Sequence, residues 1–234
     1  MIIERFESKE KALSALTDKL IGFMAAKKEP SPFNLALSGG GTAQEMFALW
    51  TKKYKEKIRW DRLHFFWVDE RCVAPTDSES NFGNAERLLF KPLRISARQI
   101  HRIRGEEEPG TEAMRYAWEV KEFLPRFNQL PTFDCIILGI GADYHTASIF
   151  PSTLELLSDS RSYTVSEHPE TGQYRITMTG PFILNGSPLL VPVLGKEAVI
   201  RTLMEGYSPA HITPASYILA HAVEAIVFTD GLKV

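Results

Sequence analysis

An aspartate and a histidine two positions apart form the most informative chemical pair in this 234-residue sequence. Asp143 and His145 lie in the segment GIGADYHTAS, directly after an apolar run. A carboxylate beside an imidazole fixes the tautomer of the ring and makes it a better general base. In an extended loop both side chains would point to the same side, which predicts that Asp143 orients His145. A structural histidine at a loop bend is the alternative.

A glycine-rich segment between a predicted strand and a predicted helix is a candidate anion site. Glycines let backbone N–H groups turn inward, and a helix N-terminus carries partial positive charge, so phosphate is favoured there. The segment lacks the Gly-Lys-Ser/Thr ending of a nucleotide-binding P-loop. A glycine-rich turn without a ligand is the alternative. The candidate residues are Ser38, Gly39, Gly40, Gly41 and Thr42.

Charged side chains follow or occupy other predicted strands. Arg71 lies in Asp69-Glu70-Arg71, directly after the most hydrophobic strand, and a guanidinium pairs with phosphate through two parallel hydrogen bonds. Arg175 lies in a later strand, and Lys196 opens a predicted helix. Each charge taken separately is more often a surface salt bridge or a solvated group. Together in one cleft, these cations would require an anionic ligand.

Alternating strands and helices position these residues. Apolar runs predict strands at 2–6, 33–37, 63–68, 133–138, 163–165, 174–178, 189–194 and 225–228. Helical spacing predicts helices over 9–27, from 42 onward, from a capping Thr111 to Phe127, and over 196–204. The alternation indicates an α/β fold with a mostly parallel central sheet flanked by helices. Residues 1–234 are predicted to form a single domain.

The carboxyl ends of the strands decide where the site should lie. In open parallel sheets, ligands bind at this edge. The segments that follow four of the predicted strands should therefore share one cleft: 38–42, 69–71, 139–145 and 195–196.

Composition limits the partners. The chain is 44% hydrophobic and 24% charged with a formal net charge of -2, as expected for a soluble enzyme rather than a nucleic-acid binder. No apolar run has the length of a membrane span, and the amino terminus lacks a signal-peptide core. Cys72 and Cys135 are too few for a disulfide framework or a zinc cluster. We expect a cytoplasmic protein without a nucleic-acid or membrane partner.

Five segments, in this order, resemble the 6-phosphogluconolactonase family: LSGGGT, WVDERCV with a following Ser-Asn, GIGADYHTASIFP, RITMT and LGKEAV. The resemblance implies a Rossmann-like fold and hydrolysis of 6-phospho-D-glucono-1,5-lactone, without a metal or organic cofactor, by a monomer or small homo-oligomer. It implies that His145 is the general base and Asp143 its neighbour. The sugar phosphate would be held by Ser38–Thr42, Asp69, Arg71, Arg175 and Lys196.

One position departs from the family pattern, and two alternative functions stay open. The family usually has glycine where Tyr144 stands, so its ring is expected either to narrow the pocket or to point outward, and to affect His145. A glucosamine-6-phosphate deaminase would carry a glutamate five residues after the histidine, where this chain has Phe150. A non-catalytic sugar-phosphate-binding module would bind the lactone without turnover.

Overall fold

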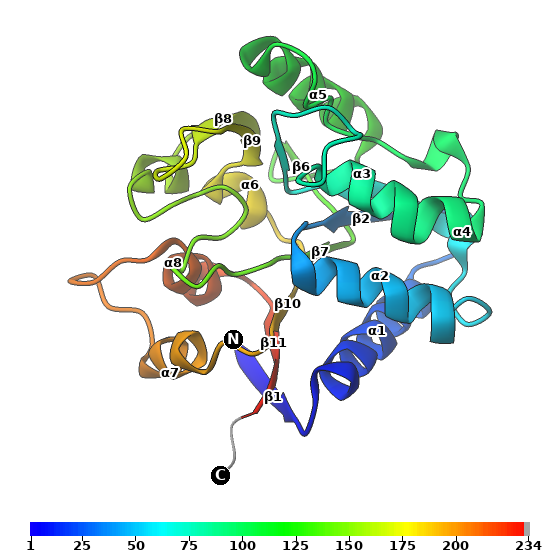
Figure 1. The fold of residues 1–234 in the computed structure, drawn as a ribbon, viewed down its shortest axis with the longest axis horizontal. Helices are drawn as coiled ribbons and strands as arrows, with labels where there is room; N and C mark the ends of the chain where they lie inside the picture. Colours follow the sequence, from blue (N-terminus) through cyan, green and yellow to red (C-terminus); the bar gives the residue numbers. More distant parts are fainter. Residues whose placement is uncertain (232–234) are drawn as a thin grey trace.

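A six-stranded parallel sheet forms the centre of the protein (Figure 1). The computed structural model describes residues 1–231, so the last three residues of the predicted 1–234 domain lie outside it. The strand order is β1-β11-β10-β7-β2-β3, and every pair is parallel. The predicted α/β class is confirmed. The strands are β1 (Ile2–Phe6), β2 (Phe33–Leu37), β3 (Leu63–Trp67), β7 (Cys135–Ile137), β10 (Leu189–Val193) and β11 (Ala225–Asp230).

Helices flank this sheet, with α1 to α4 on one side of the view in Figure 1 and α7 and α8 on the other. The longer helices are α1 (Lys9–Ala26), α2 (Gly41–Lys53), α5 (Pro109–Phe123), α7 (Glu197–Glu205) and α8 (Pro214–His221). The shorter ones are α3 (Asn81–Ala85), α4 (Lys91–Leu93) and α6 (Gly180–Ile183). Single turns complete the set: η1 (Trp60–Arg62), η2 (Glu86–Phe90), η3 (Ala97–Gln99) and η4 (Leu154–Leu157).

A second, antiparallel sheet lies beside the first and has the order β4-β9-β8. Its strands are β4 (Asp69–Arg71), β8 (Tyr163–Glu167) and β9 (Tyr174–Met178), and a separate hairpin joins β5 (Arg126–Phe127) to β6 (Leu130–Pro131). The pattern predicts β8 and β9 but not β4, because β4 is charged and only one residue separates it from β3. The register sets Arg71 opposite Arg175, so this sheet brings two cations together.

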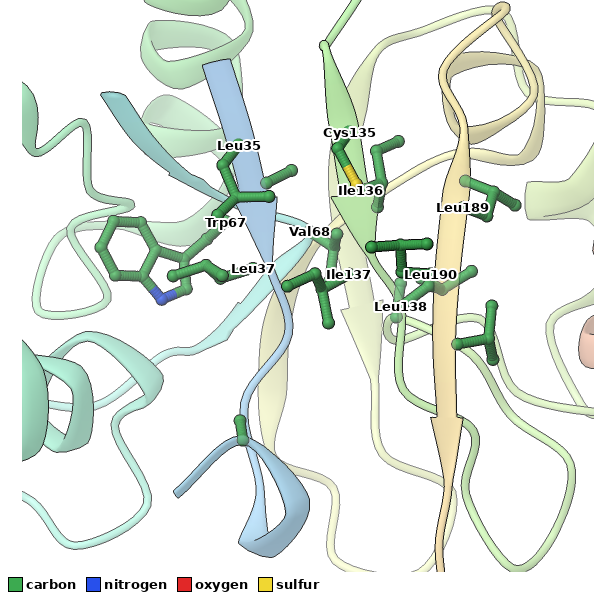
Figure 2. Close-up of a cluster of buried hydrophobic side chains, with 14 of the residues drawn as sticks. Leu35, Leu37, Trp67, Val68, Cys135, Ile136, Ile137, Leu138, Leu189 and Leu190 are labelled. Atoms are coloured by element: carbon green, nitrogen blue, oxygen red, sulfur yellow. The ribbon is translucent and has the colours of Figure 1, made fainter. Parts of the chain in front are cut away.

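The central strands bury both faces of the sheet. All residues of β2, β7 and β10 are buried, as expected for parallel strands covered by helices on both sides. Figure 2 shows the side chains of these strands meeting in one apolar cluster that includes Leu35, Ile137 and Leu190. The side chains that can do chemistry are therefore concentrated where the strands end.

The sequence patterns miss some boundaries. The predicted cap Thr111 is wrong, because α5 begins two residues earlier and the Glu108 carboxylate accepts hydrogen bonds from the N–H groups of Gly110 and Thr111. Phe127 does not lie on the helix either, since α5 ends at Phe123 and the chain turns into the β5–β6 hairpin. The pattern also misses α8, whose eight residues are too few for a clear helical period.

Removal of a central aromatic ring tests how closely this core is packed. Phe66 of β3 is fully buried, and its ring stacks on His101 at 4.4 Å between centroids. We expect Phe66→Ala to lower the free energy of unfolding by about 3–5 kcal/mol, because a cavity remains. The matched control Trp118→Ala removes a ring that is 65% exposed, so it should change the free energy of unfolding by less than about 0.5 kcal/mol. Urea denaturation measures both, and equal losses would contradict the packing described here.

Candidate active site

A cavity of about 240 Å³ lies at the carboxyl ends of β2, β3, β7 and β10. It is small beside the roughly 300–1,000 Å³ of pockets for drug-sized ligands, which suits a compact metabolite. From the residues predicted by sequence, its lining includes Ser38, Gly39, Gly40, Gly41, Thr42, Asp69, Arg71, His145, Arg175 and Lys196. It also includes Asn81, Gly139, Ile140, Gly141, Ala147 and Pro192. Of the candidate catalytic and binding side chains, Asp143 does not line it, and within the four predicted segments Glu70, Ala142, Tyr144 and Gly195 also lie outside the lining.

The glycine-rich segment forms the turn from β2 into α2. Gly40 is the N-cap of α2 and has φ +83°, in the region that favours glycine, and no side chain caps this helix. The first N–H groups of an α-helix have no acceptor within the helix, so they remain available to a ligand. Ser38 closes the base of the turn, because its hydroxyl accepts a hydrogen bond from the N–H of Gly139 at 2.9 Å. The segment can therefore present backbone donors to an anion.

Asp143 and His145 form a hydrogen-bonded pair at the edge of this cavity. The Nδ1 atom of His145 lies 2.5 Å from Oδ1 of Asp143. Burial by itself would raise the pKa of Asp143, but the charge and hydrogen bonds of His145 outweigh it and lower that pKa below its ordinary value. An ionised Asp143 accepts a hydrogen bond from the Nδ1–H group of His145, so the ring proton stays on Nδ1 and the lone pair remains on Nε2. This arrangement suits a general base.

The loop that carries this pair is a turn, and the predicted extended loop is wrong. Tyr144 has φ +67°, and its N–H donates to the carbonyl of Gly141 at 3.2 Å. A Cβ atom on Gly141 would overlap His145 Nδ1 and Asp143 Oδ1, so the close approach of the pair requires glycine there. The turn brings the two side chains together by a different route from the one that the two-residue spacing suggests.

Two arginines give the cavity its positive charge. Burial lowers the pKa of Arg175, and the neighbouring Arg71 lowers it further, while the carboxylates of Asp69, Glu79 and Glu70 oppose this change. Neither Arg71 Nε nor Arg175 Nε has a hydrogen-bond partner among the described residues. The pair therefore has capacity for an anionic ligand, and a bound phosphate would relieve the repulsion.

Lys196 supplies a third cation, beside the loop that carries His145. It is the N-cap of α7, and its Nζ atom donates to the carbonyl of Ile140. Burial lowers the pKa of Lys196, and Asp143 raises it in opposition. This ammonium group thus lies at the same loop as His145, whereas Arg71 and Arg175 belong to the antiparallel sheet.

Phe150 packs beneath these groups. It is fully buried, its ring centroid lies 5.0 Å from that of His145, and the Arg175 guanidinium lies 5.7 Å from the centroid. An apolar ring thus fills the position where a deaminase would have a glutamate.

The sequence patterns missed the polar residues Glu70, Asn81 and Ser148, whose hydrogen bonds hold the strand ends at the site. The buried Glu70 carboxylate accepts from the N–H groups of Arg71, Asn81 and Phe82 at 2.7–2.8 Å, and from the Ser80 hydroxyl. The Asn81 side chain donates to the carbonyl of Asp69, and the Ser148 hydroxyl donates to the Asp69 carboxylate. The sequence signal that could have pointed to these residues was the Asp69-Glu70 pair followed by Ser80-Asn81. The contacts among them are decided by the fold.

Among residues 1–231, no group of three or more His, Cys, Asp or Glu side chains is arranged to hold a metal ion. Within the same described part of the chain, no helix is both long enough and apolar enough to pass through a bilayer.

Comparisons with known proteins identify relatives of this fold and site. Residues 7–227 match the family described as glucosamine-6-phosphate isomerases/6-phosphogluconolactonase. The chain is 46% identical over 163 residues to a 6-phosphogluconolactonase of Treponema pallidum, covering 70% of this chain and 68% of the relative. It is 42% identical over 167 residues to one of Haemophilus influenzae, covering 71% and 70%. The crystal structure of devB protein matches with a TM-score of 0.86 and 35% identity, over 98% of this chain and 96% of that one.

The buried Glu70 predicts a pH dependence of stability. Burial raises its pKa from 4.5 to about 7, although the hydrogen bonds from Phe82, Asn81 and Arg71 oppose this. The folded state therefore binds more protons than the unfolded state between these pH values, so this group makes the protein less stable as pH rises through that window. Glu70→Gln should remove this slope while lowering overall stability by about 1–3 kcal/mol, because an amide NH₂ cannot accept from N–H donors.

Urea denaturation at several pH values between 4.5 and 7 measures the slope. The control Glu56→Gln changes an exposed carboxylate and should leave the profile as in the unmodified protein. An identical slope in the Glu70→Gln variant would contradict the assignment to Glu70.

Proposed function

The chain belongs to the glucosamine-6-phosphate isomerase/6-phosphogluconolactonase family, and on that premise we propose how its cleft hydrolyses a phosphorylated lactone. The reaction is hydrolysis of 6-phospho-D-glucono-1,5-lactone to 6-phospho-D-gluconate, a step of the pentose phosphate pathway. One observation carries the mechanism: an imidazole paired with a carboxylate lines the same cavity as two arginines, each with an Nε atom that has no partner among the described residues, and a helix N-terminus that no side chain caps.

The cationic part of the cleft holds the phosphate end of the substrate. Arg71, Arg175 and the backbone N–H groups at the start of α2 provide donors and positive charge for the phosphate. The Asp69 carboxylate would repel phosphate, so its place in the cavity suits a sugar hydroxyl donor instead. Binding energy from the phosphate then holds the lactone carbonyl in the position where water attacks.

His145 performs the proton transfers. Its Nε2 atom takes a proton from water as the water oxygen attacks C1, and the carbonyl becomes an oxyanion. The tetrahedral intermediate collapses, the bond from C1 to the ring oxygen breaks, and the imidazolium returns its proton to that ring oxygen. Asp143 stabilises the imidazolium between these two transfers. The ammonium group of Lys196, bonded to the carbonyl of Ile140 on the same loop, favours the oxyanion by its charge.

The deaminase and binding-module alternatives gain no support from the site. The buried Phe150 cannot supply the carboxylate that the deaminase alternative needs. A module that only binds would have no need for the Asp143–His145 pair at the cavity.

We propose a cytoplasmic location, which Cys72 and Cys135 support because both are free thiols. A monomer or small homo-oligomer, a single domain and the absence of nucleic-acid partners stay predictions from the sequence.

Replacement of the general base gives the direct test. His145→Ala should lower kcat by about a hundred- to ten-thousand-fold, because water then attacks without a positioned base, while KM changes little. The assay uses freshly generated lactone and subtracts spontaneous hydrolysis. The control His221→Ala changes an exposed histidine of α8 and should keep the normal kcat. Unchanged turnover in His145→Ala would remove this residue from the mechanism.

Loss of a phosphate-binding cation should act mainly on KM. Arg175→Ala removes a guanidinium that is 7% exposed, and we expect KM to rise by about tenfold or more through the loss of charged hydrogen bonds. Arg175→Lys keeps the charge without the paired donors, so its KM should lie between that of Arg175→Ala and that of the unmodified protein. Arg161→Ala, which removes an arginine paired with Asp159, is the matched control. A normal KM in Arg175→Ala would count against phosphate binding by this residue.

A further inference from the structure

The backbone of Tyr144 is strained at the centre of the proton-transfer loop. Its φ of +67° lies in the left-handed region, which a side chain other than glycine rarely adopts. Such conformations persist where surrounding contacts hold them, and they concentrate at functional sites. Tyr144 stands between Asp143 and His145, so the contacts that hold Tyr144 also fix the direction of both side chains.

The contacts come from two helices, α7 and α8. The Tyr144 hydroxyl lies 3.1 Å from the hydroxyl of Thr202 in α7. The backbone carbonyl of Tyr144 accepts a hydrogen bond from the N–H of Ala215, in the first turn of α8, at 3.1 Å. The Tyr144 side chain packs against the core and does not line the cavity. The ring therefore points away from the pocket and does not narrow it, which is one of the two outcomes expected from the sequence.

Helix α7 thus holds this loop at two points. Lys196, its N-cap, donates to Ile140, and Thr202 bonds to Tyr144. The helix itself is anchored by its apolar face, with Val199, Ile200 and Leu203 all buried. Since this face places α7 without help from the Tyr144–Thr202 bond, the effect of that bond falls on the loop.

We propose that Tyr144 is a positioning residue for the reaction. Its hydroxyl, bonded to Thr202, ties the Asp143–His145 turn to α7 and sets the direction of the imidazole in the cleft. Tyr144 touches neither the cavity nor the reacting atoms and acts through His145. This inference rests on the proposed role of His145 as the general base.

Two single-hydroxyl deletions test the proposal. Tyr144→Phe and Thr202→Val each remove one partner of the same bond and leave the ring or the branched side chain in place. We expect each to lower kcat by about 2- to 10-fold, the range for loss of one hydrogen bond, and to change KM by less than about twofold. Thr202→Ser keeps the hydroxyl and should retain most of the normal kcat. The double variant should lose no more than either single variant, because both remove one interaction.

The kinetic measurements are made at a temperature well below the thermal unfolding midpoint of every variant, so that equal fractions of enzyme are folded. Normal kcat in Tyr144→Phe and Thr202→Val, with His145→Ala inactive, would overturn this inference and leave the general base in place. Full turnover in His145→Ala would instead refute the proposed function. Losses in the double variant that multiply, or a Thr202→Ser variant as slow as Thr202→Val, would also overturn the positioning role.

Discussion

Burial of a parallel sheet on both faces is the constraint from which the site follows. β2, β7 and β10 are buried along their whole length and carry mainly apolar side chains. Polar groups are costly within such strands, because no water reaches them. Chemistry is therefore confined to the strand ends, where the chain leaves the sheet and its backbone groups are free to turn toward a ligand. The cavity at the carboxyl ends of four strands is the result.

The site combines cations that are costly to bury with the groups that make their burial tolerable. Arg175 is 7% exposed, and its pKa is lowered by burial and by Arg71. Asp69 and Glu70 oppose that change; both Glu70 oxygens accept hydrogen bonds from the backbone or from the Ser80 hydroxyl, and one Asp69 oxygen accepts from the Ser148 hydroxyl. The carboxylates thus support the cations without covering them. This leaves the guanidinium edges free for an anion, which the whole chain, with its net charge of -2, would not attract.

The loop that carries the imidazole contains strained backbone. Two residues other than glycine, Tyr144 and Ala147, have positive φ and lie on either side of His145 and Thr146. Two hydrogen bonds hold the loop: the Thr146 hydroxyl donates to the carbonyl of Gly139, just after β7, and the N–H of Ser148 donates to the hydroxyl of Thr177 in β9. These ties are the kind of surroundings that strained conformations need in order to persist. The loop geometry is therefore a property of its neighbours.

The sequence by itself determined the α/β class and the strands that end at the cavity, because apolar periodicity is local. It placed Asp143 and His145 two positions apart, but the turn that pairs them depends on contacts with neighbouring segments. It did not determine β4, since three charged residues have no period, and it placed the cap of α5 at Thr111 rather than Glu108. Only the tertiary structure decided that Arg71 lies opposite Arg175, that Glu70 holds the Ser80–Phe82 turn, and that Tyr144 reaches Thr202. Those contacts join segments far apart in the chain, and burial and pairing in the folded state, rather than local preference, select them.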